Sequence, residues 1–390
     1  MRFRTIPSAG VPVSFSQIIK IITRYVRMRE NYESFEESFS KYIGLPYCFA
    51  TWSGRSAIYL SLLAFKELKP EKSDVLISVW TCGAVYKAVK KAGLNPVLYD
   101  IDPENLGSSV ISIREKINSD TLCVITSTLF GISVNMDEIC DLLKDKQAFI
   151  MEDSAQSLGA EWGGKKIGSF GDISIFSFGK SKNITTVWGG MVCTGSEEIQ
   201  SKVSKIYSSW SKPSIIRSTK IFIVLLVNFI VIKPFFFNLF RSIIRLLFED
   251  PHFTTQFPVL KMGTFQKVIG CIMLENVEKL ITKRRENTFL IKKHMKNMHN
   301  VSFLGDVKEG RNVYLRLPII VDKEVTKDKL ISEYIKRGIW ARTSLIKPLW
   351  SYTGCDSKLY PITKKMNSKI IFLPTHPYLK KRDLMKYVIE

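Results

Sequence analysis

Groups that bind metal ions or form disulfides are scarce in this sequence. It has four histidines, none in a spacing typical of metal ligands, and seven scattered cysteines without a C-x-x-C pair. An odd number of isolated cysteines indicates reduced thiols rather than a disulfide framework or a zinc site. We therefore predict neither a metalloenzyme nor a disulfide-stabilised secreted domain.

Acidic residues are also few, since 36 Asp and Glu stand against 57 Lys and Arg, for a formal net charge of +21. Such an excess is typical of proteins that meet nucleic acid, an anionic membrane surface or a phosphorylated small substrate. The sequence contains no nucleic-acid-binding motif, so we expect no nucleic-acid partner. One protein can bind both an anionic membrane surface and a phosphorylated small substrate, so we keep both as expected partners.

Long apolar runs are missing, because no run reaches the length of about 20 residues that a membrane-spanning helix needs. Residues 1–26 contain arginines and no continuous apolar core, so we expect no signal peptide and a cytoplasmic protein. The most apolar segment, residues 212–248, combines a short apolar helix with a basic amphipathic one. Two interpretations are open for it: an element lying in the membrane interface, or a helical hairpin packed against the body or a partner subunit.

Short β-rich runs alternate with helical runs between residues 35 and 195. The predicted strands that are separated by helical stretches are 74–79, 96–100, 122–127 and 148–152. This order predicts an α/β fold with a mainly parallel sheet and helices on both faces, and a site at the carboxyl ends of the strands. Two further strands, 172–177 and 190–194, flank a loop with no room for a helix, so we expect them to be neighbours.

A chain of 390 residues suits two domains better than one. We predict a large domain over residues 1–261, with residues 212–248 as a helical insertion. A small C-terminal α/β domain would follow over residues 262–390. It would begin with one long helix, from Met262 to about Met298, whose lysines and arginines form a solvated face.

The strongest candidates for chemistry are one carboxylate and one lysine. Asp153 directly follows a predicted buried strand, where a carboxylate needs a cationic partner or hydrogen bonds. Lys182 lies in the loop between the last two strands, and a lysine held against apolar strand ends can have a lowered pKa and attack a carbonyl. The pair fits pyridoxal phosphate, because the lysine can form an imine and the acid can keep the pyridine nitrogen protonated.

A third candidate is the segment 51–57, Thr-Trp-Ser-Gly-Arg-Ser-Ala, which opens a predicted helix. Ser53, Gly54 and Ser56 would present backbone N–H groups and hydroxyls at the N-terminus of this helix, an arrangement that favours a phosphate. The motif is weak by itself, since Ser-Gly helix caps are common.

Several motifs in one order resemble the DegT/DnrJ/StrS-type sugar aminotransferases, a branch of the aspartate-aminotransferase-like fold. The segments that carry the similarity are 35–44, 93–100, 129–131, 152–156, 177–182 and 373–377. The resemblance implies a homodimer that depends on pyridoxal phosphate and has its sites at the subunit interface. Lys182 would carry the cofactor as a Schiff base and shuttle the proton, and Asp153 would pair with the pyridinium nitrogen.

The resemblance also implies roles for the remaining cofactor-binding residues. Gln156 would bind the phenolic oxygen of the ring, and Ser177 would hold the phosphate together with Gly54 and Ser56. Cys82 falls by register at the position that stacks on the ring, where an aromatic residue is usual, and Trp80 could cover the ring instead.

The implied reaction transfers an amino group from an amino acid, typically glutamate, to a keto-sugar that is usually nucleotide-linked. Its product would serve the synthesis of surface polysaccharide or lipopolysaccharide in a bacterial cytoplasm. If residues 212–248 lie in the membrane interface, as their charge and apolarity allow, they would hold the enzyme at the inner membrane as a peripheral protein.

Four positions depart from the family pattern. Arg55 stands where threonine is usual, and it could clamp the cofactor phosphate or meet an anionic substrate. Gly179 replaces a common histidine, Trp188 replaces a common acid, and an expected Asn-Tyr-Arg segment reads Val259-Leu-Lys261. The last change affects the segment that usually reaches the site of the neighbouring subunit.

These departures leave one alternative of another class, a non-catalytic relative that serves as a membrane-associated scaffold in glycan assembly. A sugar dehydratase of the same family is disfavoured, because such enzymes replace the Schiff-base lysine with histidine and this chain keeps Lys182.

Overall fold

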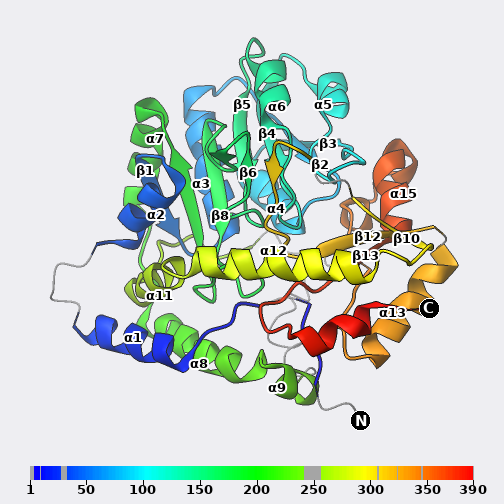
Figure 1. The fold of residues 1–390 in the computed structure, drawn as a ribbon. Helices are drawn as coiled ribbons and strands as arrows, with labels where there is room; N and C mark the ends of the chain where they lie inside the picture. The colour runs from blue at the N-terminus through cyan, green and yellow to red at the C-terminus, as the bar shows by residue number, and fades with distance from the viewer. Residues whose placement is uncertain are drawn as a thin grey trace.

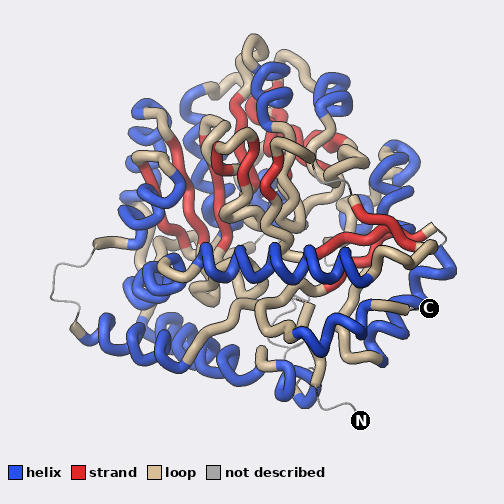
Figure 2. Tube along the Cα trace, viewed as in Figure 1, coloured by secondary structure: helices blue, strands red, loops and turns tan. Residues whose placement is uncertain are grey.

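The computed structural model describes residues 4–8, 10–27, 33–240, 256–304, 307–322, 324–343 and 346–389. They form a larger part around a seven-stranded sheet and a smaller part around a three-stranded sheet (Figure 1). The long helix α12 (Val277–His294) runs from one part to the other, and helices surround the strands of both (Figure 2).

The seven-stranded sheet has the order β1-β9-β8-β5-β4-β2-β3. Its strands are β1 (Tyr47–Thr51), β2 (Asp74–Ser78), β3 (Asn95–Tyr99), β4 (Thr121–Ser127), β5 (Phe149–Asp153), β8 (Ile173–Ser177) and β9 (Gly190–Thr194). The five strands from β3 to β8 pair in parallel, and β9 runs antiparallel to β8 and β1. The predicted mainly parallel sheet is confirmed, and so is the predicted pairing of the two strands that flank the lysine loop.

Successive residues of each strand point to opposite faces of the sheet, and each face has its own hydrophobic core. Val75, Ile77 and Cys123 face one core, whereas Leu76 and Val124 face the other. The first core is covered by α3 (Gly54–Leu68), α4 (Gly83–Lys91) and α7 (Glu197–Ser208). The second is covered by α1 (Phe15–Val26), α2 (Phe35–Ile43), α5 (Val110–Lys116), α6 (Met136–Leu143), α8 (Ile215–Val231) and α11 (Thr264–Leu274).

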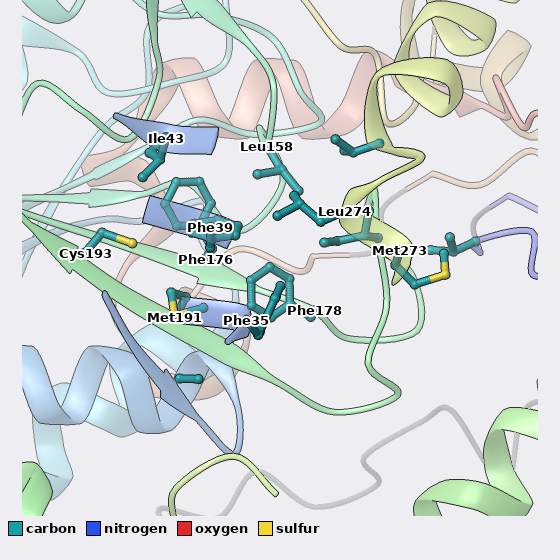
Figure 3. Packing of buried hydrophobic residues seen from close by; sticks show 14 of the residues in the cluster. Phe35, Phe39, Ile43, Leu158, Phe176, Phe178, Met191, Cys193, Met273 and Leu274 are labelled. Atoms are coloured by element: carbon teal, nitrogen blue, oxygen red, sulfur yellow. The ribbon is translucent and has the colours of Figure 1, made fainter. Parts of the chain in front are cut away.

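Aromatic rings dominate the packing of α2 against the sheet (Figure 3). The ring of Phe39 lies edge-on to that of Phe176 at 4.9 Å, and the ring of Phe35 lies 5.2 Å from that of Phe178. On α11, a Cβ added at Gly270 would come within 2.7 Å of the Phe35 ring. Glycine is therefore required for α11 to lie this close to α2. The packing fixes Phe178, the residue with which the lysine loop begins.

The smaller part contains an antiparallel sheet of β10 (Val301–Phe303), β12 (Leu317–Val321) and β13 (Ile370–Leu373). Its helices are α13 (Glu324–Lys336), α14 (Trp350–Thr353), α15 (Pro361–Lys369) and the 3-10 helices η1 (Ser357–Leu359) and η2 (Lys381–Tyr387). Short strands β6 (Glu161–Trp162), β7 (Lys165–Lys166) and β11 (Gly310–Arg311) join the two parts in a third sheet.

The single long helix predicted from Met262 is wrong, because two helices, α11 and α12, occupy this segment. The side-chain amide of Asn276 donates to the carbonyl of Ile272 at 3.1 Å and so competes with the backbone where α11 ends. The predicted solvated face is also wrong at Arg284, which is buried and donates to the carbonyls of Leu315 and Gly10.

The apolar segment after α7 folds into α8 and α9 (Pro234–Leu239), with a bend of 111° between them. Among the described residues no single helix is long and apolar enough to cross a bilayer, and only this bent pair together reaches that length and composition. Ile221, Val224 and Leu225 of α8 pack into the core of the larger part. Packing against the body therefore accounts for one face of α8. Residues 241–248 of the predicted insertion lie outside the described residues.

Candidate active site

Asp153 and Lys182 lie at the carboxyl edge of the seven-stranded sheet. Asp153 is the last residue of β5, and Lys182 follows β8, the parallel neighbour of β5. The Asp153 carboxylate accepts a hydrogen bond from the backbone N–H of Ala155 at 3.1 Å. The two charges are close enough to interact. Burial raises the pKa of Asp153 while Lys182 lowers it, and burial lowers the pKa of Lys182 while Asp153 counteracts this.

The loop that carries Lys182 is held at its base by backbone hydrogen bonds. The N–H of Phe178 donates to the carbonyl of Gly189, and the N–H of Thr186 donates to the carbonyl of Phe178, both at 2.9 Å. Val187 has a positive φ of 73°, which is unfavourable for a β-branched residue. A constrained loop of this kind is typical of functional sites, since the surrounding structure must stabilise it.

The two candidates for the ring-stacking position lie in different surroundings. Cys82 is exposed and near enough to Lys182 to raise the pKa of that amine. Trp80 is fully buried, and its indole N–H donates to the carbonyl of Ile346 at 2.8 Å. The Trp80 ring packs near Phe372 in a hydrophobic cluster of the interior. The structure thus brings Cys82 to Lys182 and holds Trp80 in the core.

The predicted phosphate-binding residues meet at the start of α3. Ser53 caps this helix by accepting the N–H of Ser56 at 3.2 Å. A Cβ added at Gly54 would lie 3.1 Å from the Cβ of Ser177 and 3.3 Å from its Oγ, so these two residues are in close contact. The hydroxyl of Ser56 is already bonded to the carbonyl of Pro258 at 2.9 Å. Gly54 and Ser177 are therefore the best placed of the set.

Two other predicted residues flank this arrangement. Gln156 is buried, and its Oε1 accepts the N–H of Phe130 at 3.3 Å, while its Nε2 donates to no residue in the described part of the chain. This amide is free to donate to a ligand oxygen. The guanidinium of Arg55 lies 5.6 Å from the centre of the Phe257 ring, a cation–π contact beside the N-terminus of α3.

These residues fit pyridoxal phosphate. A close glycine–serine contact at a helix N-terminus suits its phosphate, a buried carboxylate suits its ring nitrogen, and an unused amide donor suits its phenolic oxygen. Lys182, whose pKa is lowered by burial, suits its aldehyde.

One of the departures, Trp188, lies in an aromatic stack. The ring of Trp188 stacks on that of Trp52 at 6.1 Å, with an angle of 17° between the planes. Lys220 of α8 lies 5.8 Å from the Trp188 ring, and Arg217 lies 5.8 Å from the Trp52 ring. Helix α8 therefore places cations next to the lysine loop. Lys261, from the altered segment, donates to the carbonyl of Ser208 at 3.0 Å within this same chain.

Sequence reasoning assigned no role to two charged residues beside the site. Glu152 is buried and accepts the backbone N–H groups of Gly168, Phe170 and Gly171 at 2.6–2.7 Å, so it anchors the turn before β8. Arg316 directly precedes β12 and is buried close to Lys182, whose pKa it lowers. The sequence signal for Arg316 was its position as the single charged residue in the run 314–321.

The sheet, its carboxyl-edge carboxylate and lysine, and the attached small domain define the aspartate-aminotransferase-like fold of transferases that use pyridoxal phosphate. Solved structures share this fold over almost the whole chain. PseC of Helicobacter pylori, an aminotransferase of pseudaminic acid biosynthesis, matches with a TM-score of 0.78 and 19% identity, covering 98% of this chain and 97% of PseC. The sugar aminotransferase CalS13 of Micromonospora echinospora matches with a TM-score of 0.77 and 17% identity, covering 98% of this chain and 97% of CalS13.

The chain belongs to the DegT/DnrJ/EryC1/StrS aminotransferase family, whose model matches residues 18–219 and 255–390. The unmatched residues between these ranges fall largely within the predicted insertion. The match to the family model therefore extends the resemblance from the isolated motifs to most of the chain.

Curated relatives match over different lengths. An uncharacterized protein of Methanocaldococcus jannaschii is 38% identical over 43% of each chain. GDP-perosamine synthase of Escherichia coli O157:H7 is 34% identical over 45% of this chain and 48% of its own. The chain spans less than half the length of each of these two relatives. GDP-perosamine synthase of Caulobacter vibrioides is 24% identical over 91% of this chain and 87% of its own.

Proposed function

We propose that this protein is a pyridoxal-phosphate-dependent aminotransferase that moves an amino group from glutamate to a keto group of a nucleotide-linked sugar. The observation that carries the proposal is the buried, mutually interacting pair of Asp153 and Lys182 at the carboxyl edge of the sheet. Relatives named for nucleotide-linked sugars support the substrate class, among them the GDP-perosamine synthases and a Campylobacter jejuni transaminase named for a UDP-linked amino sugar.

Each residue of the site would contribute a definite physical effect. Pyridoxal phosphate, when bound, supplies a carbonyl that accepts an amino group and a ring that withdraws electrons. Lys182 holds or releases a proton readily, because burial lowers its pKa. Asp153 would place a carboxylate next to the ring nitrogen, and Lys182 lowers the pKa of this carboxyl against the larger effect of its burial. The N-terminus of α3, with Gly54 and Ser177, would hold the phosphate.

The further parts of the proposal are a homodimer, a cytoplasmic location and a product used for surface polysaccharide or lipopolysaccharide. A relative described as a spore coat polysaccharide biosynthesis protein of Bacillus subtilis, 30% identical over 44% of this chain, supports the last part.

Purified full-length protein tests the activity directly. We expect a yellow preparation after addition of pyridoxal phosphate, and borohydride reduction should leave a pyridoxyl adduct on Lys182 that mass spectrometry locates. L-Glutamate should bleach the colour and yield 2-oxoglutarate, after which UDP- and GDP-linked keto-sugars are screened as acceptors. A colourless protein that takes up no cofactor would favour the scaffold alternative instead.

We further propose that the enzyme docks on an anionic membrane surface through a face formed by α1, α8 and α9. Helices α1 and α8 lie side by side, since Tyr25 and Phe222 both contact the ring of Phe265 on α11 (Figure 1). The exposed apolar residues of this α1–α8–α9 face include Phe15, Ile19, Val26, Ile215, Ile216 and Leu239.

Charge complementarity favours lipid as the occupant of the α1–α8–α9 face. Lys20 of α1 and Arg27 directly after it are exposed, and the described residues of the three helices include no acid. Exposed apolar side chains among cations are typical of proteins that lie in the interface of an anionic bilayer.

Vesicle sedimentation tests the docking. The wild type should sediment with phosphatidylglycerol vesicles and not with phosphatidylcholine vesicles. Replacing Ile215 and Ile216, 84% and 82% exposed, by Asp should weaken binding at least about tenfold. The matched control is Ile111→Asp, which changes an isoleucine 71% exposed on α5. Loss of the dimer in the double variant would show instead that the face is a subunit interface.

A further inference from the structure

Two cysteines face each other on neighbouring strands of the seven-stranded sheet. Cys48 of β1 is paired with Cys193 of the antiparallel strand β9, and their two Sγ atoms lie 3.1 Å apart. All seven cysteines are free thiols, and only this pair forms a sulfur–sulfur hydrogen bond in the described part of the chain. The proposed transfer of an amino group uses neither of the two.

The hydrogen bonding of β1 shows that this pair can close into a disulfide. The carbonyl of Ala50 accepts the N–H of Met262 at 2.9 Å, so it points away from β9. Ala50 and, two residues earlier, Cys48 therefore occupy non-hydrogen-bonded positions opposite β9, where paired Cα atoms are about 4.5 Å apart. Disulfides join Cα atoms separated by about 4.4–6.8 Å, so the bond can form with the strands in their present register.

The two thiols differ in their access to solvent. Cys48 is half-buried, whereas Cys193 is fully buried. The core around Cys193 also contains Met191 and Phe176 (Figure 3). Burial raises the pKa of Cys193 well above its usual value, and the sulfur of Cys48 raises it further. A small oxidant can therefore reach Cys48 first, and the sulfur of Cys193 is already in place to react with the product.

Both strands lead into the candidate active site. Strand β1 is followed closely by the N-terminus of α3, and β9 begins directly after the lysine loop. A Cβ added at Gly190 would lie 2.5 Å from the carbonyl carbon of Ser53 and 2.7 Å from the backbone nitrogen of Gly54, so the two strands meet there without spare room. Gly190 is also paired with Ser177 of β8. A change in the spacing of β1 and β9 therefore reaches the residues that would hold the phosphate.

We propose that Cys48 and Cys193 form a reversible dithiol–disulfide switch that hydroperoxides oxidise and that loosens the phosphate site of the cofactor. The part that concerns the cofactor rests on the function proposed above. Closing the bond brings the two sulfurs about 1 Å closer, from 3.1 Å to about 2.05 Å. Free thiols are the expected resting state in a reducing cytoplasm, where disulfides are usually transient and regulatory.

The oxidation proceeds in two balanced steps. The sulfur of Cys48 attacks the O–O bond of the peroxide, which leaves a sulfenic acid on Cys48 and releases an alcohol, or water from hydrogen peroxide. The sulfur of Cys193 then attacks the sulfenic sulfur, and the S–S bond forms while the hydroxyl leaves as water with the thiol proton. The two sulfurs lose two electrons in total, and these reduce the peroxide. A dithiol reductant restores both thiols by exchange.

The experiment treats reduced, full-length wild type, Cys48→Ala and Cys193→Ala with an equimolar amount of hydrogen peroxide. Mass spectrometry of digests prepared without reductant detects the disulfide. Absorbance titration gives the affinity for pyridoxal phosphate before and after oxidation. Cys140→Ala is the matched control, because Cys140 is also half-buried but lies on α6, which packs on β5.

We expect a linked Cys48–Cys193 peptide in the wild type and in Cys140→Ala, and dithiothreitol should remove it. Oxidation should weaken the binding of pyridoxal phosphate at least about fivefold in these two proteins and leave it unchanged in Cys48→Ala and Cys193→Ala. Dimedone should trap the sulfenic acid on Cys48 in Cys193→Ala. The exposed thiol of Cys82 is present in all four proteins, so its own oxidation cannot produce this difference.

Two results would overturn the inference. Absence of the linked peptide in oxidised, folded wild type would show that the two sulfurs do not react with each other. A linked peptide with unchanged affinity for pyridoxal phosphate would show that the disulfide does not act on the cofactor site. If the wild type takes up no cofactor even when reduced, the proposed function fails, and the linked peptide still decides whether Cys48 and Cys193 form a redox pair.

Discussion

The candidate active site and the α1–α8–α9 face both carry positive charge, but they hold it in opposite ways. In the site, Lys182 and Arg316 are enclosed by the fold, and burial lowers the pKa of both. On the face, Lys20 and Arg27 are exposed among apolar side chains. An enclosed cation interacts strongly with one anion in one position, whereas exposed cations create a diffuse field that water and salt weaken.

The difference shows how one strongly basic chain can serve two kinds of anionic partner. The net charge alone suggested a membrane surface or a phosphorylated substrate and gave no means of choosing between them. The structure separates the cations into two groups. The enclosed group is suited to a small molecule of defined shape, and the exposed group is suited to a bilayer.

The largest expected effect comes from removing the amine of the site. Lys182→Met should abolish the pyridoxyl adduct and the yellow colour, because Lys182 is the buried amine that interacts with Asp153. Lys180→Met, two positions earlier in the same loop, should keep both. Mass spectrometry after borohydride reduction measures the adduct, and an adduct that survives in Lys182→Met would disprove the assignment.

Removing the carboxylate should lower the rate by about 100-fold or more without preventing attachment of the cofactor. Asp153→Asn keeps the shape of the side chain but loses the charge that would hold the ring nitrogen protonated. Single-turnover bleaching by L-glutamate measures the effect. The control is Asp172→Asn, where Asp172 accepts the N–H of Ile150 beside the start of β8. Equal losses in both variants would indicate a general structural defect.

A higher salt concentration should weaken vesicle binding by the α1–α8–α9 face about tenfold and leave cofactor binding in the candidate active site unchanged. Raising the salt concentration from about 0.1 M to about 1 M shortens the Debye length from about 10 Å to about 3 Å. We expect vesicle binding through the α1–α8–α9 face to fall at least about tenfold, while retention of the enclosed cofactor stays constant. Sedimentation and absorbance follow the two quantities in one sample, and salt-independent sedimentation would contradict an electrostatic contribution.

The smallest effect concerns the stability of the cofactor-free protein. Because burial lowers the folded-state pKa of Lys182 below its unfolded value of about 10.4, the unfolded chain binds more protons between these two values. The stability of the wild type should therefore rise with pH across that range. Lys182→Met should be the more stable protein at pH 7, by about 1.4 kcal/mol for each unit of lowered pKa, and the difference should vanish near pH 11. Thermal unfolding at several pH values measures it.

Much of the larger part could be predicted from local patterns. Short apolar runs gave strands such as β4, β5 and β9 close to their observed bounds. The alternation of strands with helical stretches was enough to predict a mainly parallel sheet, because parallel neighbours need a crossover of about this length. The position of Asp153 and Lys182 at the carboxyl edge follows from the same order of elements.

Errors arose where a contact distant in the sequence decided the outcome. The run of basic residues in α12 predicted a solvated face. Arg284 points inward instead, because the carbonyl of Gly10 and the hydroxyl of Thr375 accept hydrogen bonds from its guanidinium. The break between α11 and α12 depends on one asparagine side chain, which is a weak signal within a long helical pattern.

The sequence by itself determined the order of the strands in the larger part and the position of Asp153 and Lys182 at one edge of its sheet. These features follow from the periodicity of apolar residues and from motifs a few residues long. Only the tertiary structure decided which cations are enclosed, that Trp80 belongs to the core, and that Cys82 and Arg316 lie close to Lys182. The physical reason is that the burial of a charged or aromatic side chain depends on segments that the fold brings together from distant parts of the chain.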